Sequence, residues 1–194
     1  MIDPGSGSIV VLAPGDTHDL RRRVLRDGNP DAQLVWAGDD EPTTAHLGII
    51  LDGAIVAVST WLAPTIDTTI NTVTDTTSDT TSDTTTDTTS DTTTDTRSDA
   101  TSISPTSDAR PLTQLRGMAT EPSLAGIGLG RRLLSAGLDR AAAHGTELVW
   151  ANARLGALRF YERSGFTVMG DVFTIAETGL PHRRVEYPIS PSAT

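Results

Sequence analysis

Residues 115–166 read LRGMATEPSLAGIGLGRRLLSAGLDRAAAHGTELVWANARLGALRFYERSGF. The stretch begins in a run that alternates well enough for a strand, and a glycine-rich turn follows it. Apolar residues then recur at helical spacing from Leu129 to Ala141, and Gly145 stands where a helix commonly ends. A buried strand and a shorter helix ended by Gly165 complete the stretch. This order of elements predicts the centre of a mixed α/β domain.

Short β-rich runs and one amphipathic helix flank this centre. Asp52-Gly53 joins two apolar runs and predicts a tight hairpin, because both turn positions need positive φ. The flanking helix has an apolar stripe that includes Leu20 and Val24, and its arginines are expected on a solvated face: Arg21, Arg22, Arg23 and Arg26. We expect strands at 9–13, 46–51, 54–61, 112–120, 148–151, 166–173 and 184–189, and helices at about 17–26, 129–144 and 157–164. This order favours a mixed, mostly antiparallel sheet flanked by helices over a doubly wound one.

Residues 65–109 consist almost wholly of Thr, Ser and Asp. The tract contains nine aspartates and one arginine, so it carries −8 of the net charge of −10. Neither a helix nor a strand suits it, because its aspartates recur every four residues without an apolar face. A calcium loop would need ligands at alternate positions and a bending glycine, which the repeat lacks. We therefore expect one domain over residues 1–194, interrupted at about 65–109 by a disordered insert that replaces a turn between neighbouring strands.

Composition excludes several classes of function. The remainder of the chain carries a charge of only −2, which gives no basic stripe for nucleic acid. The chain has no cysteine and no lysine, so thiolate chemistry, zinc–thiolate sites, Schiff bases and a P-loop are excluded, and we expect no metal. We also expect no signal peptide and no membrane segment, and we place the protein in the cytoplasm.

The turn before the central helix contains Gly126, Gly128 and Gly130 at alternate positions. Such glycines let the backbone approach a ligand closely, and free amides at a helix N-terminus favour an anion such as a pyrophosphate. The spacing differs from the dinucleotide-binding pattern. Taken alone, the turn is equally compatible with a flexible connection between strand and helix.

Two segments together resemble the hallmarks of the GNAT N-acetyltransferase family. The turn resembles that family's acyl-CoA loop, written as Arg or Gln, two residues, Gly, one residue, Gly or Ala; Gly128 and Gly130 match it, whereas Ala125 departs from its first position. Residues 157–166, ALRFYERSGF, resemble its second hallmark, a short helix that carries Phe-Tyr and ends in Gly-Phe. The two hallmarks stand in the right order, separated by a helix and a strand.

This resemblance implies the family's fold, in which two central strands splay apart, and acetyl-CoA as cosubstrate. It also implies that Tyr161 protonates the coenzyme A thiolate as it leaves, a role that suits a phenol protonated at neutral pH. A backbone amide near Met118 would stabilise the tetrahedral intermediate. The residues implied to bind the cosubstrate are Met118, Ala119, Thr120, Ala125, Gly126, Ile127, Gly128, Leu129, Gly130, Arg131, Asn152 and Tyr161.

The candidates for the base that deprotonates the amine, directly or through water, are Glu121, Glu147 and His182. We expect His182 in the turn between the last two strands, where an exposed side chain without a role is the competing interpretation. The resemblance implies direct transfer of an acetyl group from acetyl-CoA to a small-molecule or peptide amine. The alternative is a catalytically silent module that binds or senses acyl-CoA. We also consider a homodimer as the assembly of the protein.

Overall fold

The computed structural model describes residues 7–66 and 110–190. The predicted disordered insert lies outside these residues except for its first two positions. The strands are β1 Ser8–Leu12, β2 Ala45–Leu51, β3 Ala54–Ile66, β4 Pro111–Thr120, β5 Leu148–Arg154, β6 Thr167–Ile175 and β7 Leu180–Pro188. The α-helices are α1 His18–Leu25, α2 Leu129–Ala143 and α3 Leu158–Arg163, with short 3₁₀ turns at Pro14–Thr17, Pro122–Leu124 and Leu155–Ala157.

The strands form a seven-stranded sheet in the order β1-β2-β3-β4-β5-β7-β6. All its neighbouring strands are antiparallel except β4 and β5, which confirms the predicted mixed, mostly antiparallel sheet. The hairpin between β2 and β3 has the expected turn, with φ of 50° at Asp52 and 79° at Gly53. β3 and β4 are antiparallel neighbours, so the Thr/Ser/Asp tract connects adjacent strands as predicted.

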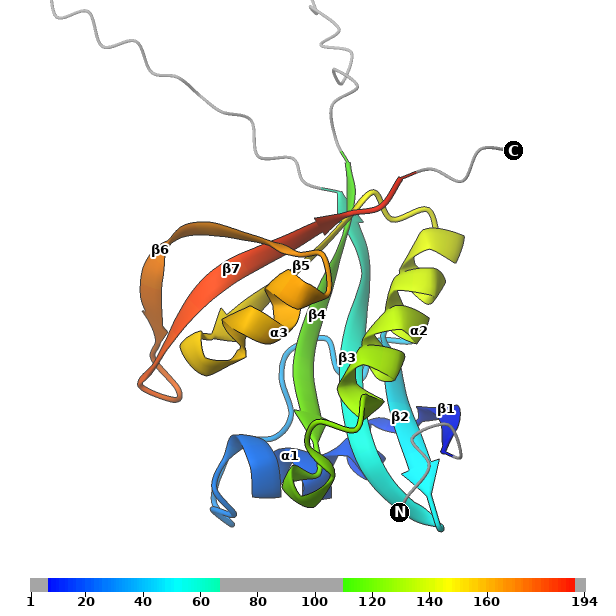
Figure 1. The fold of residues 1–194 in the computed structure, drawn as a ribbon, viewed down its shortest axis with the longest axis vertical. Helices are drawn as coiled ribbons and strands as arrows, with labels where there is room; N and C mark the ends of the chain where they lie inside the picture. The colour runs from blue at the N-terminus through cyan, green and yellow to red at the C-terminus, as the bar shows by residue number, and fades with distance from the viewer. Residues whose placement is uncertain (1–6, 67–109, 191–194) are drawn as a thin grey trace, which may run out of the picture. The chain divides into compact units, whose positions relative to one another are not determined.

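Helices α1 and α2 cover opposite faces of the sheet. Neighbouring residues of a strand point to opposite faces. On β3, Ala57 belongs to the apolar cluster that contains Leu133 of α2, whereas Val58 packs with Leu20 of α1. Tyr161 of α3 belongs to the cluster of α2. Figure 1 shows α2 along β2 and β3, and α3 beside β5 and β7.

The sheet opens between its two central strands. β4 and β5 pair only over residues 112–114 with 148–150, and beyond this point they separate, as Figure 1 shows. β4 also bulges against β3, because it has one residue more than β3 between the Thr60–Arg116 and Val58–Ala119 pairs. The splay that the family resemblance implied is therefore present. It leaves the backbone of the second half of β4 without a partner strand on the β5 side.

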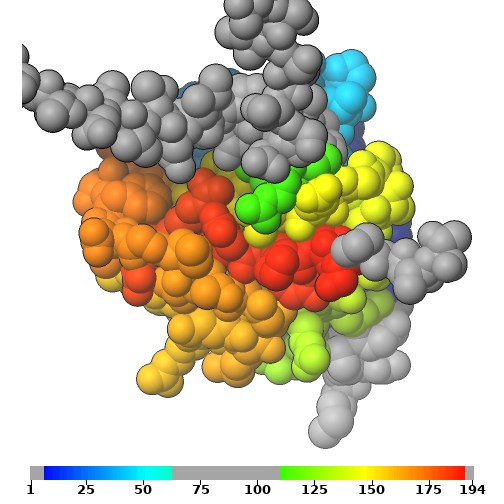
Figure 2. Space-filling model, turned by 90° about the horizontal axis from the view of Figure 1, so that it is seen from above, coloured from blue at the N-terminus to red at the C-terminus, as the bar shows by residue number. Residues whose placement is uncertain are grey.

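Figure 2 looks onto the end of the sheet where β4 and β5 begin and β7 ends. Glu147 lies at this end, exposed, with its amide donating to the carbonyl of Pro111. The splay opens toward the other end of β4. Glu147 is thus remote from the splayed region.

Arg21 contradicts the prediction of a solvated arginine face. Its side chain is fully buried, and its guanidinium donates to the carboxylate of Asp39, to Thr60 and to the carbonyl of Leu34. It also stacks on Trp36, 4.5 Å from the ring centre. The prediction failed because these partners are distant in sequence: the segment that follows α1 supplies Leu34, Trp36 and Asp39, and β3 supplies Thr60.

The last strand begins at Leu180 instead of the predicted Arg184. His182 is therefore a strand residue, paired with Arg154 of β5 and Phe173 of β6, and only 5% exposed. Gly179 (φ 64°) closes the turn just before it. Leu180-Pro181 gives a weak strand signal, because proline cannot donate to a neighbouring strand.

Candidate active site

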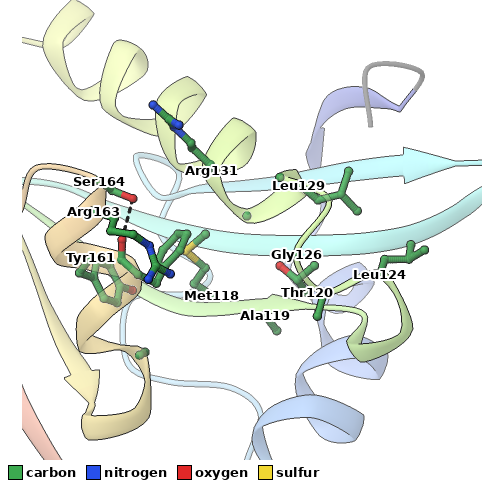
Figure 3. Close-up of a pocket in the computed structure, with 15 residues that line it drawn as sticks. Met118, Ala119, Thr120, Leu124, Gly126, Leu129, Arg131, Tyr161, Arg163 and Ser164 are labelled. Atoms are coloured by element: carbon green, nitrogen blue, oxygen red, sulfur yellow. Dashed lines mark hydrogen bonds between the residues drawn. The ribbon is translucent and has the colours of Figure 1, made fainter. Parts of the chain in front are cut away.

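A cavity of about 640 Å³ lies between the second half of β4, the N-terminus of α2 and α3. We call it the glycine-loop cavity, and Figure 3 shows it with Met118 and Tyr161 between β4 and α3. Its lining residues are Met118, Ala119, Thr120, Leu124, Ala125, Gly126, Gly128, Leu129, Gly130, Arg131, Ala157, Phe160, Tyr161, Arg163 and Ser164.

The glycines of the loop suit this cavity for an anionic ligand. Gly126 and Gly128 have φ of 86° and 94°, which L side chains rarely adopt, and Gly128 is the N-cap of α2. Among the described residues, apart from the two chain neighbours of each glycine, no heavy atom lies within 4 Å of the position that a Cβ would take on either glycine. The first amides of α2 have no intrahelical acceptor, and Arg131 and Arg163 add positive charge. The loop therefore fits a pyrophosphate that approaches its backbone.

The structure brings ten of the twelve predicted cosubstrate residues together on this cavity. Ile127 is absent from the lining, because its side chain packs against the apolar core. Asn152 lines a second cavity instead. Glu121 lines neither of the two, and its carboxylate forms an ion pair with Arg23 of α1.

Tyr161 of α3 is 7% exposed and packs edge-on between the rings of Phe160 and Phe166. Within residues 7–66 and 110–190, nothing hydrogen-bonds to its hydroxyl. Burial raises the pKa of Tyr161 to about 12. The residue therefore presents a protonated phenol at the wall of the cavity.

The second cavity has a volume of about 480 Å³, and Tyr161 lines it too. We call it the arginine cavity. Met118, Ala157 and Tyr161 line both cavities. The other lining residues are Leu25, Arg26, Trp36, Gln114, Leu115, Arg116, Gly117, Asn152, Ala153, Arg154, Ile175, Glu177, Thr178 and His182.

His182 reaches the arginine cavity from β7 and stacks on Phe173 with ring centres 6.2 Å apart. Its Nδ1 lies 2.8 Å from the carbonyl oxygen of Leu180. Because a carbonyl oxygen only accepts, Nδ1 carries a proton in this contact, and Nε2 of the neutral ring is left with its lone pair. No group in the described part of the chain hydrogen-bonds to Nε2. His182 therefore has the tautomer that a base needs.

Sequence reasoning missed the arginines and the tryptophan of the arginine cavity. Trp36 lies in the segment between α1 and β2 and stacks with Arg26 and Arg116 at 5.4 and 5.9 Å. Arg116 donates to Asp39, which is thereby shared between two arginines. No short motif joins these residues, so their meeting required the fold.

The model of the Acetyltransferase (GNAT) family matches residues 85–166, which include the glycine loop, α2, β5 and α3. Over this segment the chain is similar to the GNAT acetyltransferases, which supports an acyl-CoA-dependent N-acyltransferase. The GNAT family binds acyl-CoA and an amine acceptor. Each of the helices in residues 7–66 and 110–190 falls short of the length and hydropathy that a membrane span requires.

Individual GNAT relatives are distant in sequence. The chain is 22% identical over 171 residues to the uncharacterized N-acetyltransferase YitI of Bacillus subtilis, covering 88% of this chain and 89% of YitI. The crystal structure of Escherichia coli ElaA aligns with a TM-score of 0.59 at 16% identity, over 93% of this chain and 98% of ElaA. An acyl-CoA N-acyltransferase from Pseudomonas aeruginosa gives 0.58 at 18% identity, over 93% and 99%. These structural likenesses establish the shared fold.

Proposed function

We propose that this single domain transfers the acetyl group of acetyl-CoA directly to an amine, with acetyl-CoA in the glycine-loop cavity and the amine in the arginine cavity. The observation that carries this proposal is the wall shared by the two cavities. Met118, Ala157 and Tyr161 line both, so ligands that occupy the two cavities meet at these residues. A direct transfer needs such a junction, because no acetyl-enzyme carries the group between sites.

The residues present fit acetyl-CoA. The positive-φ glycines and the amides of α2 suit its pyrophosphate, while Arg131 and Arg163 suit its phosphate charges. The unpaired backbone of β4 beside Ala119 and Thr120 suits the amides of the pantetheine arm. Acetyl-CoA would supply an activated acyl group with a good leaving thiolate.

In the proposed reaction the amine nitrogen forms a bond to the thioester carbonyl carbon, and the bond from carbon to sulfur breaks. The thiolate receives the proton of the Tyr161 hydroxyl, which the raised pKa keeps protonated. A backbone amide of the β4 bulge near Met118 donates to the carbonyl oxygen as negative charge builds on it. The tyrosinate regains a proton from solvent.

The attacking amine must also lose a proton, and we assign its removal to Nε2 of His182. His182 lines the arginine cavity, where the amine is placed, and its Nδ1 contact leaves Nε2 free to accept. Glu121 has less support, because its carboxylate is held by Arg23 and lines neither cavity. Glu147 lies at the far end of β5.

The test is an assay of coenzyme A release with acetyl-CoA and a broad panel of amines, with products identified by mass spectrometry. Direct transfer predicts release only when an amine is present, and no acetylated protein after incubation with acetyl-CoA alone. An acetylated enzyme formed without amine would contradict direct attack. Binding of acetyl-CoA without release for any amine would instead support the silent binding module.

A further inference from the structure

The arginine cavity combines positive charge with an apolar floor. Arg26, Arg116 and Arg154 line it, whereas Glu177 is its one acidic lining residue among those the structure describes. Leu25, Leu115 and Ile175 give it apolar surface. A simple alkyl amine, which is a cation in water, would be repelled by such a lining.

Two of these arginines have no carboxylate partner within the part of the chain that the structure describes. Arg116 forms an ion pair with Asp39, which also holds Arg21. Arg26 and Arg154 form no ion pair with a carboxylate of residues 7–66 and 110–190. Both are partly buried in the walls of the cavity.

Arg26 and Arg154 come from different elements and meet at one atom. Nη1 of Arg26 and Nη2 of Arg154 donate to the carbonyl oxygen of Leu25, at 3.0 and 2.6 Å. Two like charges are thus held side by side at the end of α1. Burial first, and then the charge of Arg154, lowers the pKa of Arg26, and the opposing charge of Glu177 does not offset them.

We propose that the acceptor amine also carries a carboxylate, which Arg26 and Arg154 bind, so that the enzyme acetylates amino acids or closely related small amines. This inference rests on the proposed function, because it assumes that the arginine cavity holds the acceptor. Guanidinium groups match a carboxylate in shape and charge. Glu177 faces the same cavity and disfavours a group with two negative charges, such as a phosphate.

The experiment compares matched acceptors with the full-length enzyme. L-Alanine, L-leucine and L-phenylalanine are each set against the primary amide, the decarboxylated amine and the phosphonate analogue. We expect kcat/KM to be about 10- to 100-fold higher for the acids than for the amides. The comparison is stringent, because the amide's ammonium loses its proton more readily and intrinsic reactivity therefore favours the amide. Equal rates, or a preference for amides, amines or phosphonates, would overturn the inference.

Substitutions test whether the two arginines carry the preference. Arg154→Gln and Arg26→Gln should each raise KM much more for the acids than for the amides, so that the preference for acids is lost. Arg154→Lys keeps the charge and should retain part of the preference, while Arg159→Gln, exposed on α3 and outside both cavities, should retain all of it. An acid preference that survives loss of both arginines would overturn the assignment.

A binding measurement separates failure of the inference from failure of the proposed function. Trp36 lines the cavity, so its fluorescence should respond to acids in the presence of coenzyme A and not to the amides. Tighter binding of acids without release of coenzyme A would support the inference and reject the transferase assignment of this cavity. Acetylation of amines with no preference for acids would support the transferase assignment and reject the inference.

Discussion

The glycine-loop cavity and the arginine cavity share a wall but are built in different ways. The first is made largely from one continuous stretch, residues 118–131, with α3 closing it, and its ligand groups are mainly backbone amides. The second draws side chains from α1, the segment after it, β4, β5, the β6–β7 turn and β7. A backbone site needs glycines at fixed spacing, whereas a side-chain site needs only that distant residues meet. The first suits a constant cosubstrate, and the second can change its acceptor by single substitutions.

The largest effect should come from Gly128→Val. Valine at φ 94° strains the backbone and places a branched side chain where the ligand must approach, so acetyl-CoA binding should fall below detection by calorimetry. Gly145→Val is the matched control, because Gly145 also has a positive φ (75°) and open space around its Cβ but lies at the other end of α2. Both variants should lose stability, and only the first should lose binding. Equal affinities in the two variants would show that the loop is merely a turn.

Tyr161→Phe should test the chemical role of the wall shared by the two cavities separately from ligand binding. Because the hydroxyl acts mainly in the transition state, kcat should fall about 10³- to 10⁴-fold while the affinity for acetyl-CoA stays nearly constant. The buried ring should still pack between Phe160 and Phe166. The raised pKa, about 12, keeps the wild-type phenol protonated throughout the neutral and mildly alkaline range. Single-turnover rates that match the wild type would remove Tyr161 from the acid role.

Asp39→Asn should disrupt the ion pairs beside the arginine cavity and leave the glycine-loop cavity intact. Removing this buried carboxylate leaves Arg21 and Arg116 without their shared partner and should cost about 3–5 kcal/mol of unfolding free energy. Burial by itself would raise the pKa of Asp39, but the contacts with Arg116 and Arg21 outweigh it, and the pKa is lowered. The wild type should therefore lose this contribution as pH falls below the ordinary carboxyl range.

Urea unfolding at neutral and acidic pH checks the effect of Asp39→Asn. The gap between the two proteins should narrow as Asp39 becomes protonated in the wild type, and Asp40→Asn, an exposed neighbour, is the control. Acetyl-CoA affinity should be retained wherever the variant is folded. A variant as stable as the wild type at neutral pH would contradict the proposed importance of the network.

The same contrast explains how much could be predicted from sequence. The sequence predicts turns at Gly145 and Asp52-Gly53 and a ligand loop at the alternate glycines. These predictions are within reach because the backbone conformations that the positions require are local. Arg21 was misplaced and Arg154 went unnoticed, since the atoms they contact belong to distant segments. Asn152 lines the arginine cavity and not the glycine-loop cavity, which strand periodicity could not reveal because it does not show where β4 and β5 separate. Ile127 lies within the glycine loop, but its apolar side chain packs against the core.

His182→Gln should give the smallest effect, a fall in kcat/KM of about 100-fold or less, since water can replace part of a lost base. The fall should appear in kcat/KM for the amine, measured by coenzyme A release, while the affinity for acetyl-CoA stays nearly constant. Glu121→Gln is the informative partner, because its carboxylate is held by Arg23 and lines neither cavity, so this variant should keep nearly full kcat/KM. If His182→Gln keeps full kcat/KM and Glu121→Gln loses it, the base lies on the glycine-loop side, and the division of roles between the cavities must be redrawn.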